Sequence, residues 1–114
     1  MPTESEMLEI TFTERGKNLS LRLEGHAGYA EHGNDIICAS ASILAHTLAL
    51  IVHSSADKLD EEPIINLESG DTTIACQCKD YETLNMLLYA FDYARVGYSL
   101  LARNYPQYVR LIES

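Results

Sequence analysis

Two neighbouring segments with alternating apolar and polar residues constrain the fold of this 114-residue chain more than any other feature. The first runs from Leu8 to Thr13 and the second from Leu19 to Glu24. In both, every second residue is leucine, isoleucine or phenylalanine, which is the pattern of a strand with one buried face. Because the five residues from Glu14 to Asn18 suit a hairpin loop, the two segments are predicted to form an antiparallel pair.

A long helix is predicted after each of two strand pairs. The first helix runs from about Ile36 to Ser54 and the second from about Tyr81 to Arg103, each with apolar residues at helical spacing. Asp35 and Asp80 precede them, and an aspartate in that place can cap a helix by accepting backbone N–H groups. The first helix is so rich in apolar residues that we expect it to be central and largely buried.

The second strand pair lies between these helices. It comprises Ile64 to Glu68 and Thr72 to Cys78, joined by a turn at Ser69-Gly70-Asp71. Pro106 stops the second helix, and Tyr108 to Ile112 suits a last short strand. The order is ββαββαβ, so we predict an α+β fold in which two helices pack with a mixed, largely antiparallel sheet.

Length and residue usage indicate one domain over residues 1–114, in a reducing compartment. The acidic first residues lack the basic start of a signal peptide, and no apolar run reaches the roughly 18–20 residues that cross a bilayer. The three cysteines are an odd count without a disulfide-framework spacing. We therefore expect a cytoplasmic protein with free thiols and no membrane association.

The net charge of −9 disfavours direct nucleic-acid binding, which needs a basic surface. An acidic protein suits a basic partner, because its field accelerates the encounter. The same charge is also explained by solubility alone, so both interpretations stay open.

The stretch from Gly25 to Ser42 carries the residues best suited to chemistry. A strand is predicted to end at His26, and the helix that opens at Asp35 has Cys38 in its first turn. A base beside a cysteine at a helix N-terminus forms a thiol nucleophile site, because the helix dipole favours the thiolate. The charge of Asp35 acts against that effect, and Cys38 is alternatively a small core residue.

Of the four histidines, His26 is the preferred base. His46 lies eight residues beyond Cys38 on the same helix, about 12 Å along its axis and too far for proton transfer. His53 is farther still. His32 lies between a glutamate and a glycine in the loop, where a solvated side chain is expected. His26 has the firmer position because it ends a strand.

Two polar residues are candidates for a supporting role. Asp35 either orients His26 or only caps the helix. Ser42 lies one helical turn after Cys38, where it either bonds the catalytic residues or substrate, or is a small residue that permits close packing. The sequence leaves both pairs of interpretations open.

No metal and no cofactor is expected. His26, His32 and Cys38 match no common zinc spacing, and a zinc-dependent site is only an alternative here. Cys76 and Cys78 alternate along a strand and are expected to pack in the core. A phosphate-binding glycine loop is absent from the sequence at the helix start.

The motif resembles that of the bacterial ribosomal-processing cysteine proteases, the Prp family. The matching residues are Gly25-His26-Ala27, Gly33-Asn34-Asp35-Ile36-Ile37-Cys38-Ala39 and Ser42. The resemblance implies a homodimeric cysteine endopeptidase that removes the N-terminal extension of large-subunit ribosomal protein twenty-seven after a short apolar and aromatic segment. It also implies that Cys38 and His26 are catalytic. The alternative is a non-enzymatic, dimeric ribosome-associated binding module.

The loop between His26 and the helix contains two glycines at positions that suit hinges, Gly28 and Gly33. We predict that this loop moves when substrate binds and brings His26 and Cys38 together. Backbone N–H groups at the helix start, including that of Cys38, are candidates to bind the oxyanion of the reaction.

Overall fold

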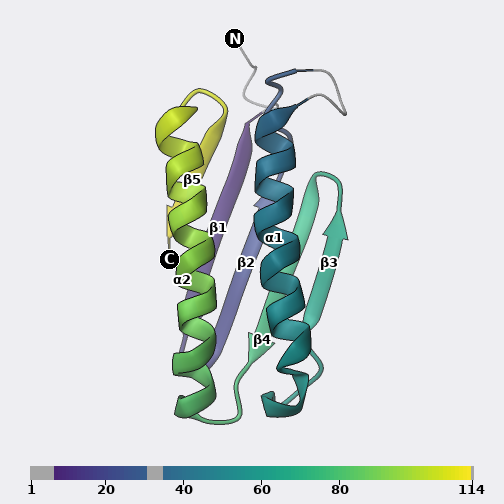
Figure 1. Cartoon of the computed structure of the whole chain (residues 1–114), viewed down its shortest axis with the longest axis vertical. Coiled ribbons are helices and arrows are strands. Elements are labelled where there is room, and N and C mark those ends of the chain that lie inside the picture. The colour runs from purple at the N-terminus through teal and green to yellow at the C-terminus, as the bar shows by residue number, and fades with distance from the viewer. Residues whose placement is uncertain (1–6, 31–34, 114) are drawn as a thin grey trace.

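The computed structural model describes residues 7–30 and 35–113 and contains a five-stranded sheet with two long helices (Figure 1). The elements in chain order are β1 (Leu8–Arg15), β2 (Asn18–Glu24), α1 (Ile36–Ser54), the short 3-10 helix η2 (Ala56–Lys58), β3 (Ile64–Glu68), β4 (Asp71–Gln77), α2 (Tyr81–Asn104) and β5 (Val109–Glu113). The predicted order ββαββαβ is confirmed, and the predicted strand and helix bounds differ from these by a few residues.

The strands lie in the order β3-β4-β2-β1-β5. All neighbours are antiparallel except β1 and β5, which are parallel. The predicted mixed, largely antiparallel sheet is therefore confirmed. Both helices lie on the same face of this sheet, so the molecule has two layers (Figure 1).

The alternation along the strands explains why the helices cover only one face. Phe12 pairs with Leu21, which in turn pairs with Ile74, so apolar side chains form continuous rows across the sheet. These side chains are buried against the helices. The residues between them, such as Thr11 and Arg22, lie on the opposite and more polar face.

The expectation that α1 is largely buried is wrong. Ile43 is 65% exposed and Leu50 is 67% exposed. The buried face is narrow and contains three alanines; its residues are Ile37, Ala41, Ala45, Leu48, Ala49 and Val52. Small side chains let α1 approach α2 closely, as shown by the hydroxyl of Tyr98, which donates to the Ala41 carbonyl at 2.9 Å. Four large apolar residues of α1 are left on the outside: Ile36, Ile43, Leu50 and Ile51.

By length and composition α1 is apolar enough to cross a membrane, so the expectation that no segment reaches that length is also wrong. Elsewhere in residues 7–30 and 35–113 no helix passes this test. In this fold α1 packs on the sheet and on α2, and core helices of soluble proteins pass the same test.

Candidate active site

The N-terminus of α1 is fixed by Asp35, which is buried. One carboxylate oxygen accepts the N–H of Ile37 at 2.9 Å and the N–H of Cys38 at 3.1 Å. The other oxygen accepts the N–H of Tyr29 at 3.0 Å. Asp35 is therefore the helix cap, as one of its two interpretations predicts, and it also ties the preceding loop to the helix. Its action on His26 stays a prediction.

Cys38 is half-buried, with its sulfur beside the end of β2. The backbone N–H of Ala27 donates to Sγ of Cys38 at 3.5 Å. Since Ala27 follows His26 directly, this contact joins the start of α1 to the segment that carries the candidate base.

The pKa of the Cys38 thiol is raised, not lowered as the helix dipole alone would predict. Burial is the main cause, and the negative charge of Asp35 adds to it, whereas the hydrogen bond from Ala27 acts in the other direction. A raised pKa disfavours the thiolate, so an activating base is needed to make the sulfur a nucleophile.

His26 follows a tight bend at Gly25, where β2 has already ended at Glu24. Gly25 has a φ of +88°, and its N–H donates to the carbonyl of Gly70 at 3.0 Å. This bond docks the β3–β4 turn beside His26, whose side chain is exposed. The prediction that the strand itself reaches His26 is therefore wrong by two residues.

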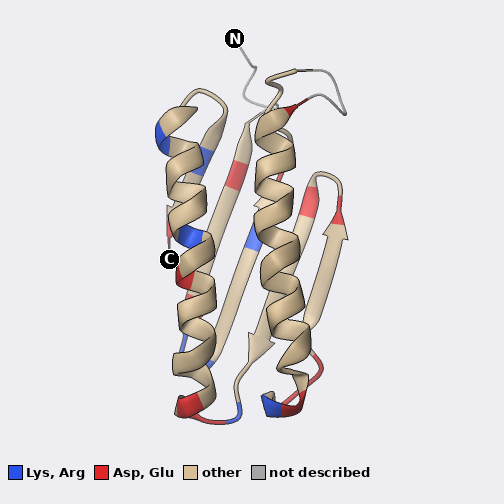
Figure 2. Cartoon of the chain, in the orientation of Figure 1, with Lys and Arg blue, Asp and Glu red and all other residues tan. Residues whose placement is uncertain are grey.

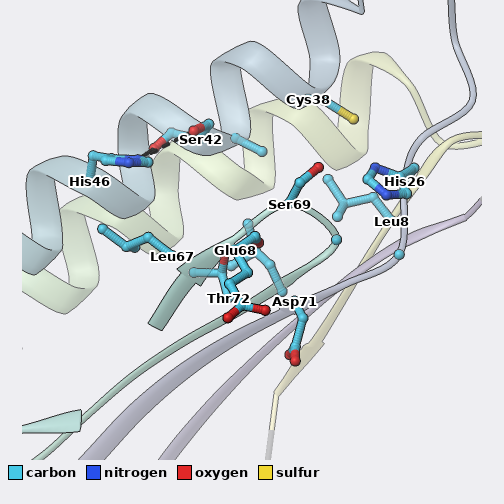
Figure 3. A pocket seen from close by; sticks show the side chains of 14 residues that line it. Leu8, His26, Cys38, Ser42, His46, Leu67, Glu68, Ser69, Asp71 and Thr72 are labelled. Carbon is cyan, nitrogen blue, oxygen red and sulfur yellow. Dashed lines mark hydrogen bonds between the residues drawn. The ribbon is translucent and has the colours of Figure 1, made fainter. Parts of the chain in front are cut away.

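Two cavities meet at Cys38, and His26 and Ser69 line both of them. The first has a volume of about 280 Å³ and lies between α1 and the β3–β4 turn. Figure 3 shows Cys38, Ser69 and His26 directed into the space between these elements. The second has a volume of about 360 Å³, and its other lining residues are Gly28, Ala30, Asp35 and Ala39. The sulfur is therefore reachable from outside.

Ser42 and His46 extend the first cavity along α1. Nδ1 of His46 lies 2.8 Å from the Ser42 carbonyl, so that nitrogen carries a proton and donates it. The Ser42 hydroxyl lies 3.3 Å from the same nitrogen. Sequence spacing excludes His46 as a base for Cys38, but the structure adds it to the cavity wall.

The structure therefore brings four of the predicted site residues to one place: His26, Cys38, Asp35 and Ser42. Gly28 lines the second cavity and has a φ of +67°. Gly33 and His32 lie outside the described residues. The predicted hinge at Gly33 and the alternative zinc site of His26, His32 and Cys38 therefore stay predictions.

The β3–β4 turn is the part of the site that the sequence does not reveal. Ser69 and Gly70 read there only as turn residues. The pairing of β4 with β2 carries this turn to the end of β2, next to His26. Because β2 and β4 are far apart in the sequence, no local sequence pattern predicts that Ser69 and Gly70 lie beside His26.

Cys76 and Cys78 are buried in the core, as predicted. Burial raises the pKa of Cys76 to about 12, with the neighbouring Cys78 as a further cause. Neither cysteine lines the cavities at Cys38. Within the described part of the chain, histidine, cysteine and acidic side chains form no group of three that could hold a metal ion.

Comparison with known proteins adds a family match. A family model described as cysteine protease Prp matches residues 7–110. A ribosomal processing cysteine protease Prp from Staphylococcus aureus is 33% identical over 54 residues, which are 46% of this chain and 51% of that protein. The chain thus aligns with about half the length of that relative.

Solved structures share the fold over almost the whole chain. The ribosomal processing protease Prp from S. aureus, crystallised with a covalently linked product peptide, has a TM-score of 0.74 at 21% identity and covers 95% of this chain and 100% of its own. A Streptococcus mutans protein, SMU.848, has a TM-score of 0.68 at 27% identity, with 95% and 94% covered.

Proposed function

This chain belongs to the cysteine protease Prp family, and from that membership we propose that it is a cysteine endopeptidase acting in ribosomal protein processing. Cys38 is the nucleophile and His26 the general base. The observation that carries this proposal is the placement of both side chains on the wall of the same open cavity. The whole chain, residues 1–114, acts as a single protease domain.

In the first step the proton of the Cys38 thiol passes to the His26 imidazole, and the sulfur attacks the scissile carbonyl carbon. The imidazolium then gives its proton to the leaving amine, which leaves an acyl group on the sulfur. Water, deprotonated by His26, hydrolyses this thioester and restores the thiol. The raised pKa of Cys38 fits a thiol that is activated only with substrate in place.

The oxyanion needs an N–H donor near the sulfur. The Cys38 N–H already donates to the Asp35 carboxylate at 3.1 Å, so it is a weaker candidate for binding the oxyanion. The Ala27 N–H faces the sulfur at 3.5 Å. We therefore assign the Ala27 N–H as the first donor to the oxyanion. When the sulfur attacks the carbonyl carbon, this N–H can exchange its bond to the sulfur for a bond to the oxyanion.

The proposed substrate is the precursor of large-subunit ribosomal protein twenty-seven, cleaved after an apolar and aromatic segment. Apolar side chains from four elements form part of the first cavity, and they suit such a segment; they are Leu8, Leu23, Ala41 and Leu67. Glu68 and Asp71 stand at the same cavity and suit the basic residues of a ribosomal protein. The cytoplasm is the proposed location, because ribosomal proteins are made there.

Substrate binding is proposed to move the loop after His26, with Gly28 as one hinge. Its φ of +67° is a conformation that glycine adopts without strain. Movement there shifts the residues that follow Gly28 relative to His26 and Cys38.

A homodimer is proposed from the outer surface of the two helices. In α2 the exposed apolar residues recur at alternating spacings of three and four; they are Met86, Tyr89, Tyr93, Val96 and Leu100. In α1 the exposed residues Ile36, Ile43 and Leu50 are spaced by seven. We call these two rows the outer seam.

No charged residue occurs in α1, and Figure 2 shows long uncharged stretches along both helices. A surface of this kind is typical of helix–helix association.

The test is incubation with the precursor ribosomal protein, followed by mass spectrometry of the products. We expect one cut at the end of the apolar segment, and no cut with Cys38→Ala or His26→Ala, while circular dichroism shows that both variants fold. Recovery of intact precursor bound to the wild-type chain would instead support the non-enzymatic binding module.

A further inference from the structure

We propose that Gly70, in the turn between β3 and β4, is a positioning residue for the imidazole of His26. This inference rests on the catalytic role proposed for His26 and extends it to an element far away in the sequence. Gly70 contributes no reacting atom. It acts by the space that its missing side chain leaves.

The contact between the two residues is close. A β-carbon built on Gly70 would lie 2.7 Å from Nε2 of His26, 3.2 Å from Cε1 and 3.4 Å from Cδ2. These three atoms form one edge of the ring, so that edge lies in the space that a side chain of residue 70 would fill, and the Gly70 backbone forms the wall beside it. Any side chain at this position must push the ring or the turn aside.

The wall is itself anchored to the backbone beside His26. The carbonyl of Gly70 accepts the N–H of Gly25 at 3.0 Å, one step beyond the last β2–β4 pair, Glu24 and Asp71. Gly70 also has a φ of +77°, a conformation that favours glycine. The turn therefore keeps a fixed place relative to the residue that precedes the imidazole.

Such a wall matters because the His26 side chain is exposed. Cys38 faces the same cavity from α1, and Gly70 lines that cavity too. Rotation of the ring away from Gly70 changes its approach to the sulfur, and proton transfer depends strongly on that geometry.

The chain offers a matched control in the β1–β2 turn. Gly16 also has a left-handed conformation, with a φ of +57°, but a β-carbon there would meet nothing within 4 Å. Gly16→Ala therefore carries the backbone strain of the substitution without any contact to the site. Gly70→Ala carries the same kind of strain and the contact with His26.

The experiment measures the rate of Cys38 alkylation by iodoacetamide as a function of pH, together with the rate of precursor cleavage. Wild type, His26→Ala, Gly70→Ala and Gly16→Ala are compared. We expect the Gly70→Ala alkylation profile to move from that of wild type toward that of His26→Ala, with cleavage reduced at least about tenfold. Gly16→Ala is expected to keep the wild-type profile and rate.

A second pair, Gly70→Asn and Gly16→Asn, covers the case in which alanine prevents folding, because asparagine tolerates a positive φ better. A Gly70 variant that folds and keeps the wild-type profile would overturn the inference. If wild type cleaves nothing but the Gly70 profile still shifts, positioning is supported and only the endopeptidase proposal fails. Identical profiles for wild type and His26→Ala would overturn both.

Discussion

At the scale of single residues, Asp35 links the stability of α1 to the reactivity of Cys38. Its carboxylate accepts three backbone N–H groups, from Tyr29, Ile37 and Cys38. The same negative charge contributes to the raised pKa of Cys38, after the larger effect of burial. The residue that orders the helix start therefore also adds to the rise in the pKa of the Cys38 thiol.

Neutralising this charge separates the two roles. In Asp35→Asn the remaining oxygen can still cap the helix, since asparagine caps about as well as aspartate, whereas the charge and the bond from the Tyr29 N–H are lost. The pKa of Cys38 should then fall, so that iodoacetamide modifies Cys38 at lower pH than in wild type. Asp80→Asn is the control, because Asp80 caps α2 through the Thr83 N–H in the same way without being among the groups that shift the pKa of Cys38. An unchanged or higher pH midpoint for Cys38 would refute this role of Asp35.

Sequence reasoning works well for single residues that lie within one local motif. The relative positions of Asp35, Cys38 and Ser42 are predictable because a cap and one helical turn fix them, whereas the strand before His26 ends two residues earlier than predicted. Gly70 is not predictable, because its place against His26 depends on the pairing of β4 with β2. The sign of the Cys38 pKa shift is also missed, since it depends mainly on burial and burial is a property of the folded chain.

At the scale of elements, the contact between α1 and α2 depends on small residues and one buried phenol. The Tyr98 side chain is fully buried, and burial raises the pKa of its hydroxyl group. That hydroxyl donates to the Ala41 carbonyl at 2.9 Å, one turn after Cys38 along α1. Tyr98 thus fixes the helix that carries Cys38.

Removing the hydroxyl should loosen this contact without unfolding the protein. We expect Tyr98→Phe to reduce the free energy of unfolding by about 1 kcal/mol, the usual net value of a hydrogen bond lost inside a protein. Urea denaturation followed by circular dichroism measures the change. Tyr81→Phe serves as the control, since Tyr81 is exposed at the start of α2. Equal stability of Tyr98→Phe and wild type would show that the bond contributes nothing.

The elements themselves are predictable because periodicity and caps are local signals, and both helices begin at the predicted residues. Which face of α1 is buried is not predictable from hydrophobicity alone. The alanine face of α1 packs inward because it permits close approach, and Ile43 and Leu50 are left outside.

At the scale of the whole molecule, one layer of helices covers one face of the sheet and exposes the outer seam. The molecule measures 45 Å by 22 Å in the plane of the layers, so this face offers roughly 1,000 Å², against about 800 Å² per partner in a standard interface. A second copy related by twofold symmetry would cover the seam with the same seam. Neither cavity beside Cys38 is lined by a residue of α2.

A charge in the seam should separate the two copies. Tyr93 is 76% exposed at the centre of the α2 row, so Tyr93→Glu is expected to convert a dimer into a folded monomer by charge repulsion and desolvation. Sedimentation velocity reports the mass of the species. Asn18→Glu adds the same charge on the other face of the sheet and should leave the dimer intact. A monomeric wild type, or a dimeric Tyr93→Glu variant, would contradict the assignment.

The central claim is that a peptide can reach the sulfur of Cys38 and that His26 activates it there. A peptide chloromethyl ketone that ends in an aromatic residue tests this claim most directly, with the modified cysteine identified by mass spectrometry. The account predicts one adduct, on Cys38 and not on Cys76 or Cys78, with a rate at least about tenfold lower in His26→Ala. Modification of all three cysteines at similar rates, or an unchanged rate in His26→Ala, would contradict it.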